Sequence, residues 1–180
     1  MRNIKTHIAI LTLLAANVGL TTALASDAET SAAAASNGLR RDGYAAATAE
    51  YDGRVGFART DSRSGPVNLA RGVAVGVDED GLSLSISNAV ATRFGPAIAT
   101  NFNISIERDG DVSTSNGVVV ARSPISRSVT AGGGATAGRF GGGGATSFAT
   151  GQTDRFGRVD AKSESHAHRP LRTVLRKLLH

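Results

Sequence analysis

The strongest constraint on how this chain can fold is a two-residue alternation of side-chain character between residues 67 and 130. Larger apolar or β-branched residues alternate there with small or polar ones. The larger members are Val73, Val75, Val77, Leu82, Leu84, Ile86, Ile98, Thr100, Phe102, Ile104 and Ile106. Successive side chains of a β-strand point to opposite faces, so this period predicts strands with one buried side and one solvent-facing side.

Turn-forming residues divide this region at regular intervals. The turn sequences are DEDG (78–81), RFGP (93–96), RDGD (108–111) and RSP (122–124). Each contains glycine or proline, which tight turns favour, so we predict an all-β fold with a small antiparallel β-meander over 67–130. The predicted strands are 67–77, 82–92, 97–107 and 111–121, with 125–130 as a fifth. Asn116-Gly117 falls inside the fourth strand and predicts either a bulge or a second turn.

The regions on both sides of the meander are rich in small residues and lack the alternation. Residues 26–66 are predicted to be a flexible leading segment, in which Asp52-Gly53 favours a hairpin over 44–60. The alanines at 45, 46, 47 and 49 suit a helix equally well. Residues 131–168 contain the sequence GGGAT twice and are predicted to be a flexible glycine-rich linker. With no cysteine, no tryptophan and 22 glycines, the chain has no disulfide framework and a thin predicted core.

The first 25 residues have the features of a secretory signal peptide. Basic Arg2 and Lys5 precede an apolar run over 8–20, and Ala23-Leu24-Ala25 places small residues where a signal peptidase reads them. The run is too short, and too diluted by threonine and asparagine, for a membrane span of about 20 residues. We therefore expect cleavage between Ala25 and Ser26, and a secreted, periplasmic or cell-surface protein.

Residues 169–180 predict a short basic amphipathic helix. Leu171, Val174, Leu175 and Leu178 fall on one helical face. The side chains that we predict to bind anions are Arg169, Arg172, Arg176 and Lys177. Residues 122–180 carry ten basic and three acidic side chains, against eight and twelve in residues 26–121, which is typical of an interaction tail. Such a helix can bind anionic polysaccharide or an anionic membrane surface, or its apolar face can pack on the protein's own sheet.

Two groups of residues are candidate metal ligands, and the sequence predicts no other cofactor. In an extended chain Glu164, His166 and His168 project from one face, and two imidazoles with a carboxylate can hold zinc or copper. The acidic turns offer oxygen ligands that suit calcium. These candidates are Asp78, Asp80, Asp109 and Asp111. The pattern of a calcium-binding loop is absent, and exposed acidic turns are common without a metal.

A meander also places successive turns alternately at its two ends. The acidic turns 78–81 and 108–111 should therefore share one end, and Arg93 and Arg122 the other. This polarity can orient molecules head to tail, and the open edges of the sheet allow self-association.

The sequence shows no catalytic motif. There is no nucleophile elbow or phosphate loop, and all histidines after residue 25 lie in the last fifteen residues. Nucleic acid is not an expected partner, because the basic region has few aromatic residues. We expect an exported, non-catalytic structural or interaction protein of the cell envelope or extracellular matrix, whose basic C-terminal arm binds anionic polymer or membrane. The alternative is a small secreted metal-ion-binding domain that uses the acidic turns or the His166/His168 pair.

Overall fold

The computed structural model describes residues 26–38, 42–138 and 143–168. The predicted signal peptide (1–25) and the predicted C-terminal helix (169–180) lie outside the described residues. The regular secondary structure of the described residues consists of strands alone, so the all-β prediction is confirmed. Within that part of the chain there is no helix of the length and apolarity needed to cross a membrane.

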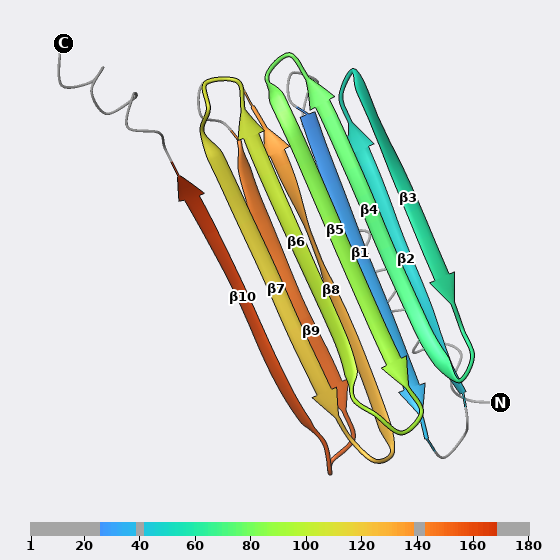
Figure 1. Ribbon diagram of the computed structural model, residues 1–180. Coiled ribbons are helices and arrows are strands. Elements are labelled where there is room, and N and C mark those ends of the chain that lie inside the picture. The colour runs from blue at the N-terminus through green and yellow to red at the C-terminus, as the bar shows by residue number, and fades with distance from the viewer. Residues whose placement is uncertain (1–25, 39–41, 139–142, 169–180) are drawn as a thin grey trace.

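The described strands number ten and form two antiparallel sheets that lie face to face (Figure 1). Their bounds are β1 Ser26–Asn37, β2 Asp42–Asp52, β3 Val55–Arg63, β4 Val67–Asp78, β5 Gly81–Thr92, β6 Ala97–Glu107, β7 Val112–Arg122, β8 Ser126–Ala137, β9 Gly144–Thr153 and β10 Arg158–His168. The six-stranded sheet has the order β10-β7-β6-β5-β4-β3, and the four-stranded sheet has the order β2-β1-β8-β9.

The predicted meander forms the centre of the six-stranded sheet. Strands β4 to β7 follow one another as antiparallel neighbours, and their bounds lie within one residue of the four predicted strands. Asn116-Gly117 is neither a bulge nor a turn, because the register with β6 runs through it without a break. A β-carbon on Gly117 would lie 2.5 Å from the Asn101 side-chain oxygen, so glycine is needed there for close packing.

The predictions for the flanks are wrong. The fifth strand begins near residue 125 but extends to Ala137 as β8, and it lies in the other sheet between β1 and β9. Residues 26–66 contribute three strands, and residues 131–168 contribute the rest of β8 together with β9 and β10. The prediction of flexibility assumed that alanine, serine and glycine bury too little surface. In the folded chain these small side chains let two sheets approach closely, and backbone ladders stabilise both.

The predicted hairpin over 44–60 is also wrong in its pairing. The two runs are strands, β2 and β3, but they belong to different sheets. β2 pairs with β1, and β3 pairs with β4. Asp52-Gly53 therefore connects one sheet to the other, with Gly53 at a φ of 141° and its amide donating to the Asp52 carboxylate.

Most side chains between the two sheets are small or polar, and the two largest that are fully buried are Val119 and Val129. Buried members are Ala28, Ala32, Ala34, Ala70, Ala74, Ala89, Ala91, Ala97, Ala99, Ala121, Ala131, Ala135, Ser83, Ser85, Ser87, Asn101, Asn103 and Ser105. The alternation of the meander does produce one buried and one exposed face, but the small residues form the buried one. The reason lies in the opposing sheet, whose inward positions are mainly alanine, glycine, serine and threonine and are matched in size by this face.

Hydrogen bonds across the interface replace part of the missing apolar burial. The Thr30 hydroxyl of β1 lies 2.8 Å from the Ser85 hydroxyl and 2.7 Å from the Ser87 hydroxyl of β5. The Asn101 amide donates to the Gly132 carbonyl at 2.7 Å. Similar bonds run from Asn103 to the Thr146 carbonyl (2.8 Å) and from Ser105 to the Thr136 carbonyl (2.7 Å). Buried polar groups need such partners, so the interface specifies its own register.

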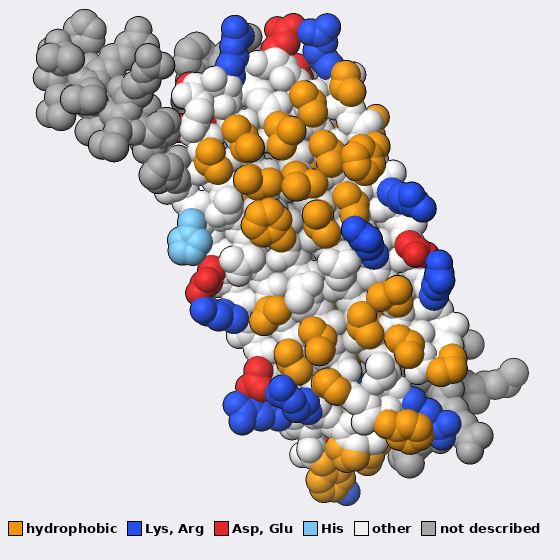
Figure 2. All heavy atoms as spheres, viewed as in Figure 1, with side chains coloured by type: hydrophobic (Ala, Val, Ile, Leu, Met, Phe, Trp, Pro, Cys, Tyr) orange, Lys and Arg blue, Asp and Glu red, His pale blue; other side chains and the backbone are white. Residues whose placement is uncertain are grey.

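Most of the larger apolar residues of the meander lie on the outer side of the six-stranded sheet, whereas Val119 lies in the core. We call this surface the aliphatic face; its members are Val73, Val75, Val77, Leu82, Leu84, Ile86, Val90, Ile98, Phe102, Ile104, Ile106, Val118 and Val120. Figure 2 shows them as two hydrophobic bands with charged side chains along both edges of the sheet. A mainly polar row separates the bands; it runs through Arg71, Asn88 and Thr100 and continues to Val118 on β7.

Candidate functional site

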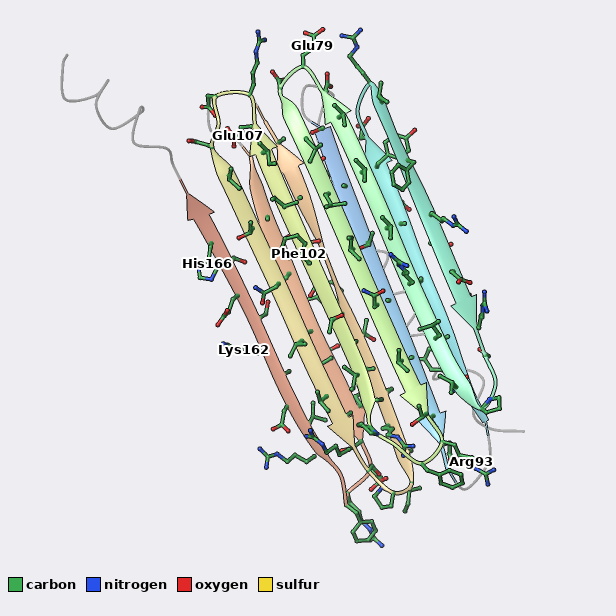
Figure 3. All side chains as sticks on the ribbon, in the orientation of Figure 1. Glu79, Arg93, Phe102, Glu107, Lys162 and His166 are labelled. Carbon is green, nitrogen blue, oxygen red and sulfur yellow. The ribbon has the colours of Figure 1, made fainter. Side chains whose placement is uncertain are left out.

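The two ends of the molecule differ in charge, as the turn pattern predicted. Figure 3 shows Glu79 and Glu107 at one end of the sheets and Arg93 at the other. The turns after β5, β7 and β9 meet at the second end, which we call the arginine end. The prediction that Arg93 and Arg122 share an end, opposite the acidic turns, is confirmed by the hairpin pairing of β4 to β7.

An open hollow of about 490 Å³ lies at the arginine end. Its lining residues are Phe94, Gly95, Pro96, Arg122, Ser123, Pro124, Phe156 and Arg158. The two phenylalanines are unusually exposed, at 88% for Phe94 and 63% for Phe156. Two exposed aromatic rings beside guanidinium groups are costly to solvate, so this end has the character of a binding surface.

The repeated tripeptide Arg-Phe-Gly builds both aromatic corners of the hollow. At 93–95 and at 155–157 the arginine lies over the ring of the phenylalanine that follows it. The guanidinium carbon is 4.8 Å from the Phe94 ring centre and 4.6 Å from the Phe156 ring centre. A third copy, at 139–141, lies outside the described residues. The stacking places a guanidinium group against each ring, and the Arg93 Nε atom is buried without a hydrogen-bond partner among the described residues.

Arg122 and Arg158 form the cationic wall of the hollow. Both bind the Asp160 carboxylate, at 3.0 Å and 2.8 Å respectively. Their side chains are 60% and 79% exposed, so water screens these ion pairs and they contribute little to stability. An anionic ligand can therefore compete with Asp160 for either guanidinium group.

Asp154 holds the two turns that form the floor of the arginine end. Its carboxylate accepts hydrogen bonds from the Ser123 hydroxyl and from the backbone amides of Ser126 (2.9 Å) and Phe156 (2.8 Å). These bonds, led by that from Ser123, lower the pKa of Asp154 to about 2. The carboxylate thus stays ionised at any physiological pH and ties the Phe156 turn to the start of β8.

No known protein family, curated protein or solved structure matches this chain.

The acidic end contains the predicted oxygen ligands. The two acidic turns are neighbours, joined by the Arg108 amide, which donates to the Asp80 carbonyl at 2.9 Å. Among the described residues the cluster that could hold a metal consists of Glu107, Asp109 and Asp111, whose carboxylate oxygens lie within 4.8 Å of one another. Asp78 and Asp80 do not belong to this cluster, whereas the predicted Asp109 and Asp111 do.

The other predicted metal ligands lie on β10, at the edge of the six-stranded sheet. Glu164 and His166 share its outer face, with the His166 Nε2 atom 4.0 Å from a Glu164 carboxylate oxygen. Glu164 is also paired with Lys162, which lowers the pKa of the carboxylate. His168 is the last residue of the strand, and its side chain lies outside the described part. The described side chains of this strand therefore form no cluster of three ligands.

The structure also shows a carboxylate ladder that sequence reasoning missed. On the outer face of β1 and β2, Asp27 lies opposite Asp52, and Glu29 lies opposite Glu50. Burial raises the pKa of Asp27, opposed by a hydrogen bond from Thr136 and assisted by Asp52. Burial raises the pKa of Glu29 as well, with Asp27 and Glu50 adding repulsion. The paired residues are more than twenty positions apart in sequence, so only the strand register reveals the ladder.

Phe156 and Arg158 were missed too, because 131–168 was predicted to be a linker. The Arg-Phe-Gly tripeptide was the available signal, since its two described copies, at 93–95 and 155–157, both lie in turns of the arginine end. The predicted anion-binding residues of the C-terminal arm, Arg169, Arg172, Arg176 and Lys177, lie outside the described residues.

Proposed function

We propose that this protein is an exported, non-catalytic interaction protein of the cell envelope or extracellular matrix that binds an anionic polysaccharide at its arginine end. The observation that supports this proposal is the pairing of two exposed phenylalanine rings with arginines around one hollow. The C–H face of a sugar ring packs on an aromatic ring, and arginine binds carboxylate or sulfate through two parallel hydrogen bonds. A uronic acid or sulfated sugar offers both groups.

The experiment measures binding to polygalacturonate, with neutral dextran as the uncharged comparison, by isothermal titration calorimetry. We expect Phe156→Ala and Arg158→Glu each to weaken binding about tenfold or more, and added salt to weaken it further, because exposed charges are screened within about 8 Å at physiological ionic strength. The matched control is Arg54→Glu, which removes an exposed arginine at the acidic end, where Arg54 pairs with Glu79. Equal weakening by the control would contradict a specific site at the arginine end.

The basic C-terminal arm stays a separate prediction of the same function. His168, the last described residue before the arm, lies opposite Val112 at the acidic end of the sheets, away from the hollow. A chain that ends at His168 should keep the binding that depends on Phe156. If the arm binds anionic polymer or an anionic membrane surface, the shortened chain should bind more weakly than the full chain, and the binding that is lost should be sensitive to salt.

A second candidate function is binding of calcium at Glu107, Asp109 and Asp111. One observation favours it: an Asp111 carboxylate oxygen is buried and has no hydrogen-bond partner among the described residues. Three clustered carboxylates are hard oxygen ligands, which calcium prefers. Calorimetry with calcium chloride should show binding that Asp109→Asn abolishes and Asp78→Asn retains. Absence of heat at millimolar calcium would exclude this function.

A further inference from the structure

The aliphatic face is an apolar surface that no other described element covers. Phe102, Ile98 and Val118 are 42%, 40% and 43% exposed, although each belongs to a central strand of the sheet. Soluble proteins rarely expose an apolar patch of more than a few hundred Å² unless a partner covers it. The question is therefore which partner fits this face.

The register gives the aliphatic face an internal symmetry about the line between β5 and β6. Three strands lie on each side of this line, so β5 corresponds to β6, β4 to β7 and β3 to β10. Leu84 lies opposite Ile104, and Ile86 lies opposite Phe102. A two-fold axis along this line would place each apolar row of one copy over the same row of another. The polar row through Asn88 would likewise meet its own copy.

The charged edges of the sheet fit the same axis. The register across the six strands places three charged residues of β3 in the same rows as three charged residues of β10. The pairs are Arg59 with Glu164, Asp61 with Lys162, and Arg63 with Asp160. The axis that places β5 over β6 also places β3 of one copy over β10 of the other. Each of the three rows then brings together residues of opposite charge, and symmetry repeats every pair. In the third row Asp160 also binds Arg122 and Arg158 of its own copy, so the first two rows carry most of the charge match.

We propose that the aliphatic face binds the same face of a second copy of this chain, about a two-fold axis that runs parallel to the strands between β5 and β6. Six strands at about 4.8 Å spacing and about ten residues at about 3.3 Å rise give a face of roughly 950 Å². A stable interface buries about 800 Å² of each partner, so the area is sufficient. The axis keeps the strands of both copies aligned, as packed sheets require.

The dimer has a consequence for the binding of polymer. A two-fold axis parallel to the strands leaves both arginine ends on the same side of the assembly. One polysaccharide chain can then contact two hollows at once, which raises the overall affinity without any new type of contact. The dimer can be tested apart from that function, because Leu84, Asp61 and Lys162 do not line the hollow.

The test is sedimentation velocity of the exported full chain over a concentration series up to ~100 μM. We expect a dimer, and Leu84→Lys should raise its dissociation constant about 100-fold or more, because each dimer would bury two unpaired ammonium groups. The matched control is Thr150→Lys, on the outer face of the four-stranded sheet, which should leave the dimer unchanged. A monomer at every concentration, or equal dissociation by the control, would overturn the proposal.

A charge exchange tests the axis with variants that leave the apolar surface intact. Asp61 and Lys162 are exposed, so neither Asp61→Lys nor Lys162→Asp should disturb the fold. Each single variant should weaken the dimer about 2- to 30-fold, and the double variant should restore it. Failure of the double variant to restore the dimer overturns this axis.

The remaining occupant of the face is the chain's own segment 169–180. If a chain that ends at His168 forms dimers while the full chain stays monomeric, that segment covers the face and the proposal is overturned.

Discussion

Replacing Ser85 with alanine tests whether the small polar face of the meander is the buried one. The Ser85 hydroxyl is fully buried and lies 2.8 Å from the Thr30 hydroxyl, 2.5 Å from the Asn103 side-chain oxygen and 3.0 Å from the Gly133 carbonyl. It can donate one hydrogen bond and accept another, and each contributes about 0.5–1.5 kcal/mol net. Ser85→Ala should therefore lower the free energy of unfolding by about 1–3 kcal/mol. For a chain of this size that is about 2–12 °C in the thermal midpoint.

The matched control is Ser83→Ala, two residues earlier on the same strand and the same face. Ser83 is equally buried, but its hydroxyl makes only longer contacts, 3.2 Å to the Ser26 hydroxyl and 3.4 Å to the Gly76 carbonyl. Loss of the Ser83 hydroxyl should therefore lower the free energy of unfolding clearly less than loss of the Ser85 hydroxyl. Denaturant unfolding followed by circular dichroism measures both. The reasoning is refuted if Ser85→Ala is as stable as the parent, or if Ser83→Ala costs as much.

Three further predictions follow from the packing and from the carboxylates. Gly133→Ala should be strongly destabilising, since its β-carbon would lie 2.1 Å from the backbone carbonyl oxygen of Thr146 on the neighbouring strand. Gly144→Ala is the control and should be tolerated, because its β-carbon would meet nothing within 4 Å. Thermal midpoints of unfolding that fall equally for the two variants would refute this. Glu50→Gln should raise the stability at neutral pH by about 0.2–1 kcal/mol, because like charges directly opposite destabilise a strand pair. It should also lower the raised pKa of Glu29, as measured by NMR titration. Asp154→Asn should destabilise the protein above about pH 4, and the difference in stability from the parent should shrink as the pH falls toward about 2. The reason is that the hydrogen bonds that lower the pKa of Asp154 stabilise the folded state only while the carboxyl group is ionised. A difference in thermal midpoint that does not change with pH would contradict this assignment.

Much of the fold was determined by features that are local in sequence. The period-two alternation placed β4 to β7 within one residue of their observed bounds, because the pleat of a strand fixes which side chains share a face. The turn residues fixed the alternation of acidic and arginine-bearing ends, since antiparallel neighbours must reverse direction at each turn. These conclusions need no knowledge of what packs against the sheet.

The tertiary structure decided which face of the meander is inside. Seen alone, a strand such as β5 offers a leucine and isoleucine side and a serine side, and apolar burial favours the first. The opposing strands β1, β2, β8 and β9 offer mainly alanine, glycine, serine and threonine, so two small surfaces meet and hydroxyl and amide groups bond across them. That complementarity depends on segments far away in the chain, which sequence composition alone marked as flexible.

The same dependence on distant segments explains why the candidate site was only half predicted. Arg93 and Arg122 were placed at one end from the turns, whereas Phe156 and Arg158 joined them because β10 pairs with β7. The charge match between the edge strands β3 and β10 is likewise a product of register accumulated over six strands. Local patterns thus determined the strands and their polarity. Contacts between strands distant in sequence decided the core, the hollow and the surface left for a partner. The reason is that the effect of a side chain's size or charge at these places depends on the residue that lies opposite it.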